Sequence, residues 1–402
     1  MAQSGGFSRT RLAHLSDTMR GHVERGELAG LVALLARHDE VHAMAFGVQD
    51  LDTGTPMRRD SIFRIASMTK PVTAAAAMIL VEEEKLRLDD PVDRLLPELA
   101  GRRVLRSLEG PLGDTVPANR PITVRDVLTF RLGFGAVMAP PGQYPIQAAI
   151  EKAGLAPGPN PLPFGPDEFL RRLGGLPLMH QPGERWMYHT GSDVLGVLVE
   201  RAAGMAFGDF LAERIFAPLS MKDTGFSVPE GKLDRLATCY RTDAETGRLV
   251  AYDRARGGLW SRPPTFQSGG GGLVSTADDF LAFGRMMLRG GRHGTNRILT
   301  RPSIELMTTD HLTPAQKAAS PFFPGFWDTN GWGFGVAVST TPGGLGPEPG
   351  SYGWIGGFTT AWRSAPAEDV VAILLTQRLM SGPALPAVIA DFWTHAHQAI
   401  DD

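Results

Sequence analysis

Apolar residues recur along the N-terminal part of the chain with two different periods. Residues 31–37 and 41–47 are apolar runs separated by the turn-like His38-Asp39-Glu40, which predicts an antiparallel hairpin. Before them, the spacing of apolar residues from Thr10 onward predicts an amphipathic helix. Residues 68–86 are also helical in pattern, but they are too apolar on all sides to form a surface helix.

Strands return in the C-terminal part of the chain. Three strands and a closing helix are predicted at residues 332–339, 357–364, 370–377 and 383–397. Strands at both ends with helices between them predict an α+β fold, in which one antiparallel sheet is assembled from both termini and flanked by helices. We expect this α/β sheet domain at residues 1–86 and 261–402, and a mostly helical inserted domain at residues 87–260.

One long connection stands out within the helical region. Residues 140–166 contain eight prolines and four glycines, and the whole chain has 31 prolines and 48 glycines. Such a segment predicts a long ordered loop, which we interpret as a wall or lid of a pocket.

Composition and charge narrow the functional classes. Lys plus Arg is 40 and Asp plus Glu is 43, which gives a net charge of −3 and no basic footprint for nucleic acid or an anionic membrane. Cys239 is the only cysteine, so an intramolecular disulfide, an iron–sulfur cluster and a thiolate zinc site are excluded. No apolar window approaches 18 residues, and the first residues are polar, so we expect a soluble cytoplasmic protein.

Ser67 and Lys70 are the first candidates for chemistry. They are three residues apart, so a helix places them on one face, and Pro71 fits if that helix begins near Ser67. A serine hydroxyl becomes a nucleophile when an adjacent base takes its proton, and a lysine of depressed pKa can be that base. The alternative is a helix-capping serine beside a solvated lysine, but the very apolar helix that follows argues against it.

Two further segments could complete such a site. Tyr188 lies at a loop-to-helix junction, where a neighbouring ammonium would favour its phenolate and allow acid–base work. The alternative is that Tyr188 has no catalytic role and is a core residue with a hydrogen-bonded hydroxyl. Residues 350–358 are rich in glycine, and a free N–H there could pair with that of Ser67 as an oxyanion hole. Without the other two motifs, this segment is only a turn into a strand.

Together these segments resemble the serine β-lactamase-like hydrolases of the class C type, and within them the family VIII carboxylesterases. Ser67-Met68-Thr69-Lys70 resembles the S-x-x-K motif, and Tyr188 the tyrosine of Y-x-N. Ser351-Tyr352-Gly353 falls where K-T-G would lie, so Trp354 takes the second oxyanion position. Residues 122–129 and 269–279 carry supporting similarity.

Two departures from the motifs bear on the substrate. Thr190 replaces the asparagine and Ser351 replaces the lysine that β-lactamases keep. The resemblance therefore implies an esterase with a Ser67 acyl-enzyme, with Thr190, Ser351, Tyr352 and Gly353 facing a small-molecule ester. It implies no metal and no cofactor.

Several alternatives stay open. An acyltransferase of the same fold would share the acyl-enzyme, and β-lactamase or D-amino peptidase activity would use the same nucleophile. A non-catalytic penicillin-binding module is disfavoured by the intact Ser67, Lys70 and Tyr188. An α/β-hydrolase is disfavoured because no G-x-S-x-G pentapeptide occurs. The natural acyl and alcohol groups, the acylation base and the oligomeric state do not follow from the sequence.

Overall fold

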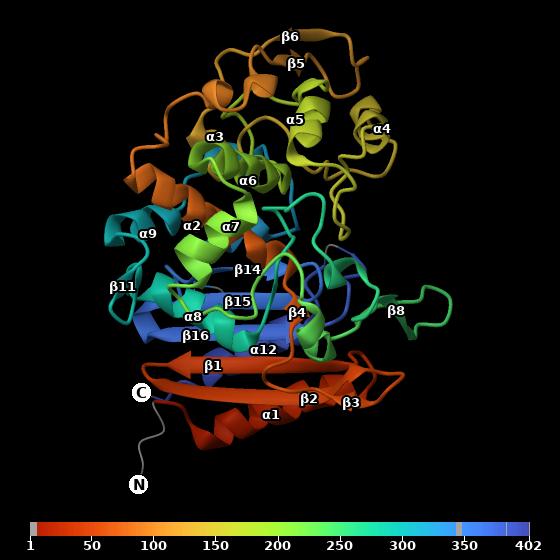
Figure 1. The fold of residues 1–402 in the computed structure, drawn as a ribbon, viewed down its shortest axis with the longest axis vertical. Coiled ribbons are helices and arrows are strands. Elements are labelled where there is room, and N and C mark those ends of the chain that lie inside the picture. Colours follow the sequence, from red (N-terminus) through yellow and green to blue (C-terminus); the bar gives the residue numbers. More distant parts are fainter. Residues whose placement is uncertain (1–5, 343–347, 383, 402) are drawn as a thin grey trace.

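An eight-stranded antiparallel sheet lies at the centre of the computed structural model, which describes residues 6–342, 348–382 and 384–401 (Figure 1). Its strands follow in the order β12 (Asn330–Trp332), β13 (Ala337–Ser339), β14 (Tyr352–Gly356), β15 (Thr360–Ala365), β16 (Val370–Thr376), β1 (Gly30–Arg37), β2 (Glu40–Asp50) and β3 (Thr55–Pro56). The predicted hairpin is confirmed as β1 and β2. The N-terminal and C-terminal strands meet where β1 pairs with β16. The predicted fold class, an antiparallel sheet built from both termini, is confirmed.

Helices cover both faces of this sheet because alternate residues of β1 point to opposite sides. Leu31, Ala33 and Leu35 belong to a cluster with α1 (Arg9–Glu24) and α12 (Ala387–Gln398). Val32 and Leu34 join the larger core with α8 (Ala277–Leu288) on the other face. Both faces being covered explains why every residue of β1 is buried.

The helical part of the molecule lies above the sheet in Figure 1. It contains α3 (Val124–Leu128), α4 (Pro145–Lys152), α5 (Pro166–Gly174), α6 (Thr190–Ala203) and α7 (Phe207–Leu211). Helix α2 (Thr69–Glu82) passes between this part and the sheet and is buried from Thr69 to Leu80, as its uniform hydrophobicity predicts. The predicted loop at residues 140–166 contains α4 and ends where α5 begins.

The structure differs from the predicted strands in one region. Residues 332–339 form two strands, β12 and β13, because the chain turns between them at Gly335, whose φ is +71°. A β-carbon at Gly335 would lie 2.8 Å from the carbonyl oxygen of Lys70, so only glycine permits this approach. The strand β14 that follows was predicted only as a turn leading into β15.

The predicted inserted region is not wholly helical. It includes the hairpins β5–β6 (Arg103–Leu105, Thr115–Pro117) and β7–β8 (Cys239–Thr242, Leu249–Asp253). Tyr240 of β7 bridges to Arg378, just after β16, so this hairpin lies beside the end of the large sheet. The division at residues 86 and 261 stays a prediction. Within the described residues, no helix combines the length and the apolar character needed to cross a membrane.

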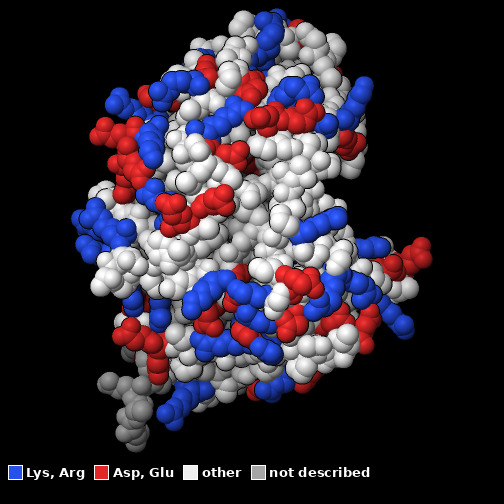
Figure 2. Space-filling view, in the orientation of Figure 1, with Lys and Arg blue, Asp and Glu red and all other residues white. Residues whose placement is uncertain are grey.

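Charges of both signs are mixed over the face of the molecule seen in Figure 2. The waist between the helical part and the sheet is hollowed on one side and carries mostly uncharged residues there. This distribution offers no extended basic surface on that face.

Candidate active site

A short 3-10 turn, Ala66–Met68, places Ser67 at the entrance to the buried helix α2. Ala66 has a left-handed backbone with φ of 44°, a conformation that costs a residue with a β-carbon about 1–2 kcal/mol. The turn is held from behind, since the carbonyl oxygen of Ile65 accepts a hydrogen bond from the Thr360 hydroxyl at 3.1 Å. This hydrogen bond from β15 thus helps to stabilise the strained turn. Ser67 itself remains partly exposed.

Lys70 lies directly against the serine. Its Nζ is 2.8 Å from Ser67 Oγ and donates to the carbonyl oxygen of Gly270 at 2.6 Å. The side chain is fully buried, and burial lowers the pKa of Lys70 to about 7, although the nearby Asp193 carboxylate raises it. Near neutral pH, a large fraction of Lys70 is a neutral amine with a lone pair available to the serine proton.

Tyr188 completes the group. Its hydroxyl accepts a hydrogen bond from the indole Nε1 of Trp354 at 2.8 Å, and it also hydrogen-bonds Ser67. Lys70 Nζ lies over the phenol ring, 4.6 Å from its centroid. The ring is packed among other aromatic side chains, namely Phe130, Trp186, Phe322 and Trp332.

The structure brings Ser67, Lys70 and Tyr188 together, but the expected phenolate is wrong. Burial raises the pKa of Tyr188 to about 12, despite the hydrogen bonds with Ser67 and Trp354 that lower it. The physical reason is position: the lysine nitrogen faces the ring rather than the hydroxyl oxygen, and aromatic packing removes water. Tyr188 is therefore a neutral phenol at neutral pH.

His189, which sequence reasoning passed over, adjoins Lys70. Its backbone has φ of 81° and ψ of −68°, and the Thr190 N–H donates to the Tyr188 carbonyl oxygen at 3.2 Å. This is a γ-turn of the rare, strained hand. The turn brings His189 Nδ1 to 3.3 Å from Lys70 Nζ. Two strained residues, Ala66 and His189, thus flank the serine and the tyrosine.

Asp193 holds the other side of this imidazole. Its carboxylate lies 3.3 Å from His189 Nε2 and accepts hydrogen bonds from the Ser268 hydroxyl at 2.6 Å and the Gly270 N–H at 2.9 Å. Burial together with the lysine charge lowers the pKa of His189, so the ring is neutral and the geometry fits a hydrogen on Nε2. The spacing of His189 and Asp193 on one helix turn was the available sequence signal.

The four predicted substrate-facing residues are placed differently from one another. Thr190 is buried at the start of α6. Ser351 is buried, and its hydroxyl has no hydrogen-bond partner within the described part of the chain. Tyr352 packs against Trp362 in the core, whereas Gly353 lines a cavity. Among the described residues, no hydrogen bond or ring contact joins Ser351 or Tyr352 to Ser67, Lys70 or Tyr188.

Trp354 reaches the site through its side chain, whereas its backbone N–H was the predicted contact. The part of β14 that lies against the turn before Ser67 is Gly356, where a β-carbon would clash with the carbonyl oxygen of Ile65. Gly357 follows, with open space where a side chain would stand. Among the described residues, no acceptor forms a hydrogen bond with the Gly357 N–H.

Small cavities flank the group on two sides. One of about 130 Å³ is lined by Tyr188 and by residues 136–139. Another of about 30 Å³ is lined by His189, Ser268 and residues 158–161 of the proline-rich segment. Asn160 of that segment accepts a hydrogen bond from the Tyr252 hydroxyl at 2.6 Å, which ties the loop across to β8. The proline-rich segment thus forms part of a cavity wall beside His189.

Comparison with known proteins gives one family. The model of the β-lactamase family matches residues 15–390. Protein Rv1367c of Mycobacterium tuberculosis is 41% identical over 372 residues, covering 90% of this chain and 88% of that protein. Esterase EstB of Burkholderia gladioli is 31% identical over 382 residues, covering 90% and 89%. Among solved structures, EstCE1, described as a hydrolase with promiscuous acyltransferase activity, has a TM-score of 0.78 at 26% identity and 98% coverage of both chains.

Proposed function

This chain belongs to the β-lactamase family, and on that premise we propose that it hydrolyses carboxylic esters through an acyl-enzyme on Ser67. One observation carries the proposal: the buried Lys70 Nζ lies 2.8 Å from Ser67 Oγ, at a lysine whose pKa is lowered to about 7. A neutral amine in this place is the base that a serine nucleophile requires. The relative named esterase EstB supports ester hydrolysis as the reaction.

We assign acylation to Lys70 and Tyr188 acting in sequence. Ser67 Oγ attacks the ester carbonyl carbon while its proton passes to the neutral Nζ of Lys70. The C–O bond to the alcohol then breaks as the Tyr188 phenol gives its proton to the leaving oxygen. The proton held by Lys70 returns to Tyr188 through a water molecule, because the lysine nitrogen faces the phenol ring and not its oxygen. A phenol with a pKa of about 12 suits this role, because it remains a donor across neutral pH.

Deacylation reverses these transfers with water in place of the alcohol. Water adds to the acyl carbon as its proton passes to Tyr188, whose own proton moves to Lys70 through a second water molecule. Ser67 Oγ then leaves as it takes the proton from Lys70, and the carboxylic acid is released. Tyr188 thus passes the proton on, and Lys70 holds it until Ser67 takes it back.

His189 and Asp193 act as positioning residues in this scheme. The imidazole Nδ1 accepts from Lys70 Nζ at 3.3 Å, while the carboxylate accepts from Nε2–H and from the Gly270 N–H. Gly270 in turn binds the lysine through its carbonyl oxygen. These contacts fix the direction of the amine lone pair toward Ser67.

For the oxyanion we propose the backbone N–H of Ser67 and a second donor from the end of β14. The sequence favours Trp354, but Gly356 is the residue whose main chain lies against Ile65. We therefore prefer the Gly357 N–H, which follows that contact and has no other partner among the described residues.

Ester hydrolysis and the acylation of Ser67 are tested together. We expect wild type to cleave p-nitrophenyl butyrate, Ser67→Ala to lose at least about a thousandfold in kcat/KM, and mass spectrometry to find one acyl group on Ser67 only. Ser16→Ala, on α1 beyond the sheet, is the matched control and should keep full activity. An equally active Ser67→Ala variant would overturn the proposal.

Acyl transfer is a second candidate, favoured by the description of EstCE1 as a hydrolase with promiscuous acyltransferase activity. An acceptor alcohol would then replace water in deacylation. Product analysis with and without added alcohol decides between the two, since only a transferase forms a new ester in preference to the acid.

We further propose membership of the family VIII carboxylesterases and a cytoplasmic location. The Ser67-Met68-Thr69-Lys70 motif supports the first. Fractionation of the native host tests the second.

A further inference from the structure

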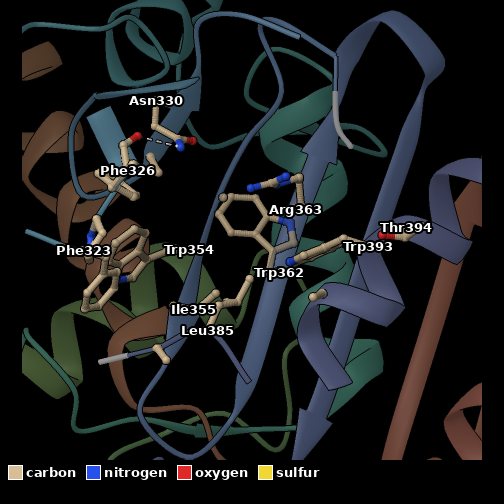
Figure 3. Close-up of a pocket in the computed structure, with 16 residues that line it drawn as sticks. Phe323, Phe326, Asn330, Trp354, Ile355, Trp362, Arg363, Leu385, Trp393 and Thr394 are labelled. Carbon is tan, nitrogen blue, oxygen red and sulfur yellow. Dashed lines mark hydrogen bonds between the residues drawn. The ribbon is translucent and has the colours of Figure 1, made fainter. Parts of the chain in front are cut away.

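A cavity of about 720 Å³ lies between the loop that precedes β12, the strands β14 and β15, and the beginning of α12 (Figure 3). Its walls are aromatic and aliphatic, with Phe326, Trp354, Trp362, Trp393 and the half-exposed Leu385 among them. This volume is within the range of small-molecule sites. The proposed reaction leaves the cavity unused.

Arg363 is the only charged residue among the described residues that line this cavity. Its guanidinium lies over the ring of Trp393, 5.0 Å from the centroid. Across the described ranges, Arg363 forms neither a hydrogen bond nor an ion pair, and burial alone lowers its pKa to about 10. The arginine is thus still charged at neutral pH.

The Arg363 side chain is only partly buried, so water reaches its guanidinium, but no group of the described chain pairs with it. Two arginines that are buried are paired within the chain: Arg64 with Asp253, and Arg102 with three backbone carbonyl oxygens. Arg363 has five N–H donors in a planar fork, the geometry that matches a carboxylate. A carboxylate that enters the cavity would therefore find a charged donor with no competing partner among the described residues.

We propose that this cavity binds the carboxylate of an apolar organic acid, with Arg363 as the anion-binding residue. The aromatic walls take the apolar body of the acid, and Trp393 keeps the guanidinium plane in place by its ring contact. Leu385, at 49% exposure, lies at the rim as an apolar entry point.

Trp354 links this cavity to the proposed reaction centre. Trp354 is one of the residues that line the cavity, and its indole donates Nε1–H to the Tyr188 hydroxyl. The carboxylate could belong to either of two molecules: a free acid, or an ester substrate that bears a carboxylate away from the ester bond. Either molecule would touch the group that orients the proton relay.

Binding is measured with 1-naphthylacetate and its neutral isostere 1-naphthylacetamide, by calorimetry on the full chain carrying Ser67→Ala. We expect the acid to bind about tenfold to a hundredfold more tightly than the amide, the range for a hydrogen bond to a charged group. Adding Arg363→Met should remove this difference while the amide binds as before. Equal binding of acid and amide would overturn the proposal, whatever the role of Ser67.

Two further variants guard against loss of fold. Arg363→Lys keeps the charge and should retain part of the preference for the acid, and Ala390→Trp should fill the cavity and weaken both ligands. Unchanged binding in Ala390→Trp with native circular dichroism would place the ligand elsewhere and refute the site.

These two possibilities are distinguished by kinetics of the active enzyme on p-nitrophenyl butyrate. A rise in KM with added 1-naphthylacetate indicates that the cavity is part of the substrate path. A change in kcat at constant KM indicates a separate acid acting through Trp354. If the acid binds but changes neither constant, the link through Trp354 is refuted.

Discussion

The lowered pKa of Lys70 makes the rate of ester hydrolysis depend on pH in a definite way. With a pKa of about 7, the neutral amine is about one tenth of the population at pH 6 and about nine tenths at pH 8. If the neutral form is the base, kcat/KM rises about tenfold over this interval and then levels off. A solvated lysine would instead give a rise that continues beyond pH 9.

The assay is the pH profile of kcat/KM for p-nitrophenyl butyrate from pH 5.5 to 9.5, corrected for spontaneous hydrolysis. A flat profile, or one still rising tenfold per pH unit at pH 9, would refute the assignment of Lys70 as the base.

The same pKa shift has a consequence for stability that needs no turnover. The unfolded chain holds the Lys70 proton up to a pKa of about 10.5, whereas the native state releases it near 7. Between these values the unfolded state binds more protons, so the free energy of unfolding rises with pH, by about 2 kcal/mol from pH 7 to pH 9. Lys70→Met should lack this gain. Parallel stability curves for wild type and Lys70→Met over pH 7–9 would contradict the shift itself.

Three substitutions extend these expectations. Trp354→Phe removes the indole donor to the tyrosine hydroxyl, and we expect kcat to fall about threefold to tenfold, the worth of one hydrogen bond; an unchanged kcat would dismiss that contact. Asp193→Asn removes the negative charge that raises the pKa of Lys70, so the rising limb of kcat/KM should move to lower pH, and a move upward would contradict the sign. Asp253→Asn leaves the buried guanidinium of Arg64 uncompensated, and urea unfolding should show a loss of about 3–5 kcal/mol; a loss below 1 kcal/mol would mean that the pair is dispensable.

Local pattern was sufficient to predict the parts of the site that lie on one helix. Ser67 and Lys70 share a helix face, and Pro71 in the first turn of α2 marks where that helix begins. The hairpin of β1 and β2 follows from alternation and a turn in the same way. The placement of these residues is confirmed because it depends on neighbours in the sequence, whereas their catalytic roles stay predictions.

What the sequence could not predict depends on long-range contacts and on burial. Burial among side chains that are distant in the sequence, such as Phe130, Phe322 and Trp332, raises the pKa of Tyr188, so the phenolate prediction was wrong. Trp354 acts through an indole whose direction is decided by the register of β14 with β15, where it pairs with Trp362. His189 lies beside Lys70 because of a strained turn, which the hydrophobic periodicity of the sequence does not predict.

The seam between β1 and β16 bears on how this molecule is made. Leu31 pairs with Thr376, and the Ser8 N–H donates to the Ala399 carbonyl oxygen. Strand β1 therefore cannot pair with β16 until both strands have been synthesised. Pairings of such separation in sequence form late in folding. The Thr360 hydroxyl that supports the strained turn before Ser67 belongs to the same late strands. A growing chain on the ribosome would therefore contain Ser67 long before the strands that support its turn, and the proposed site would form only when β15 and β16 join the sheet.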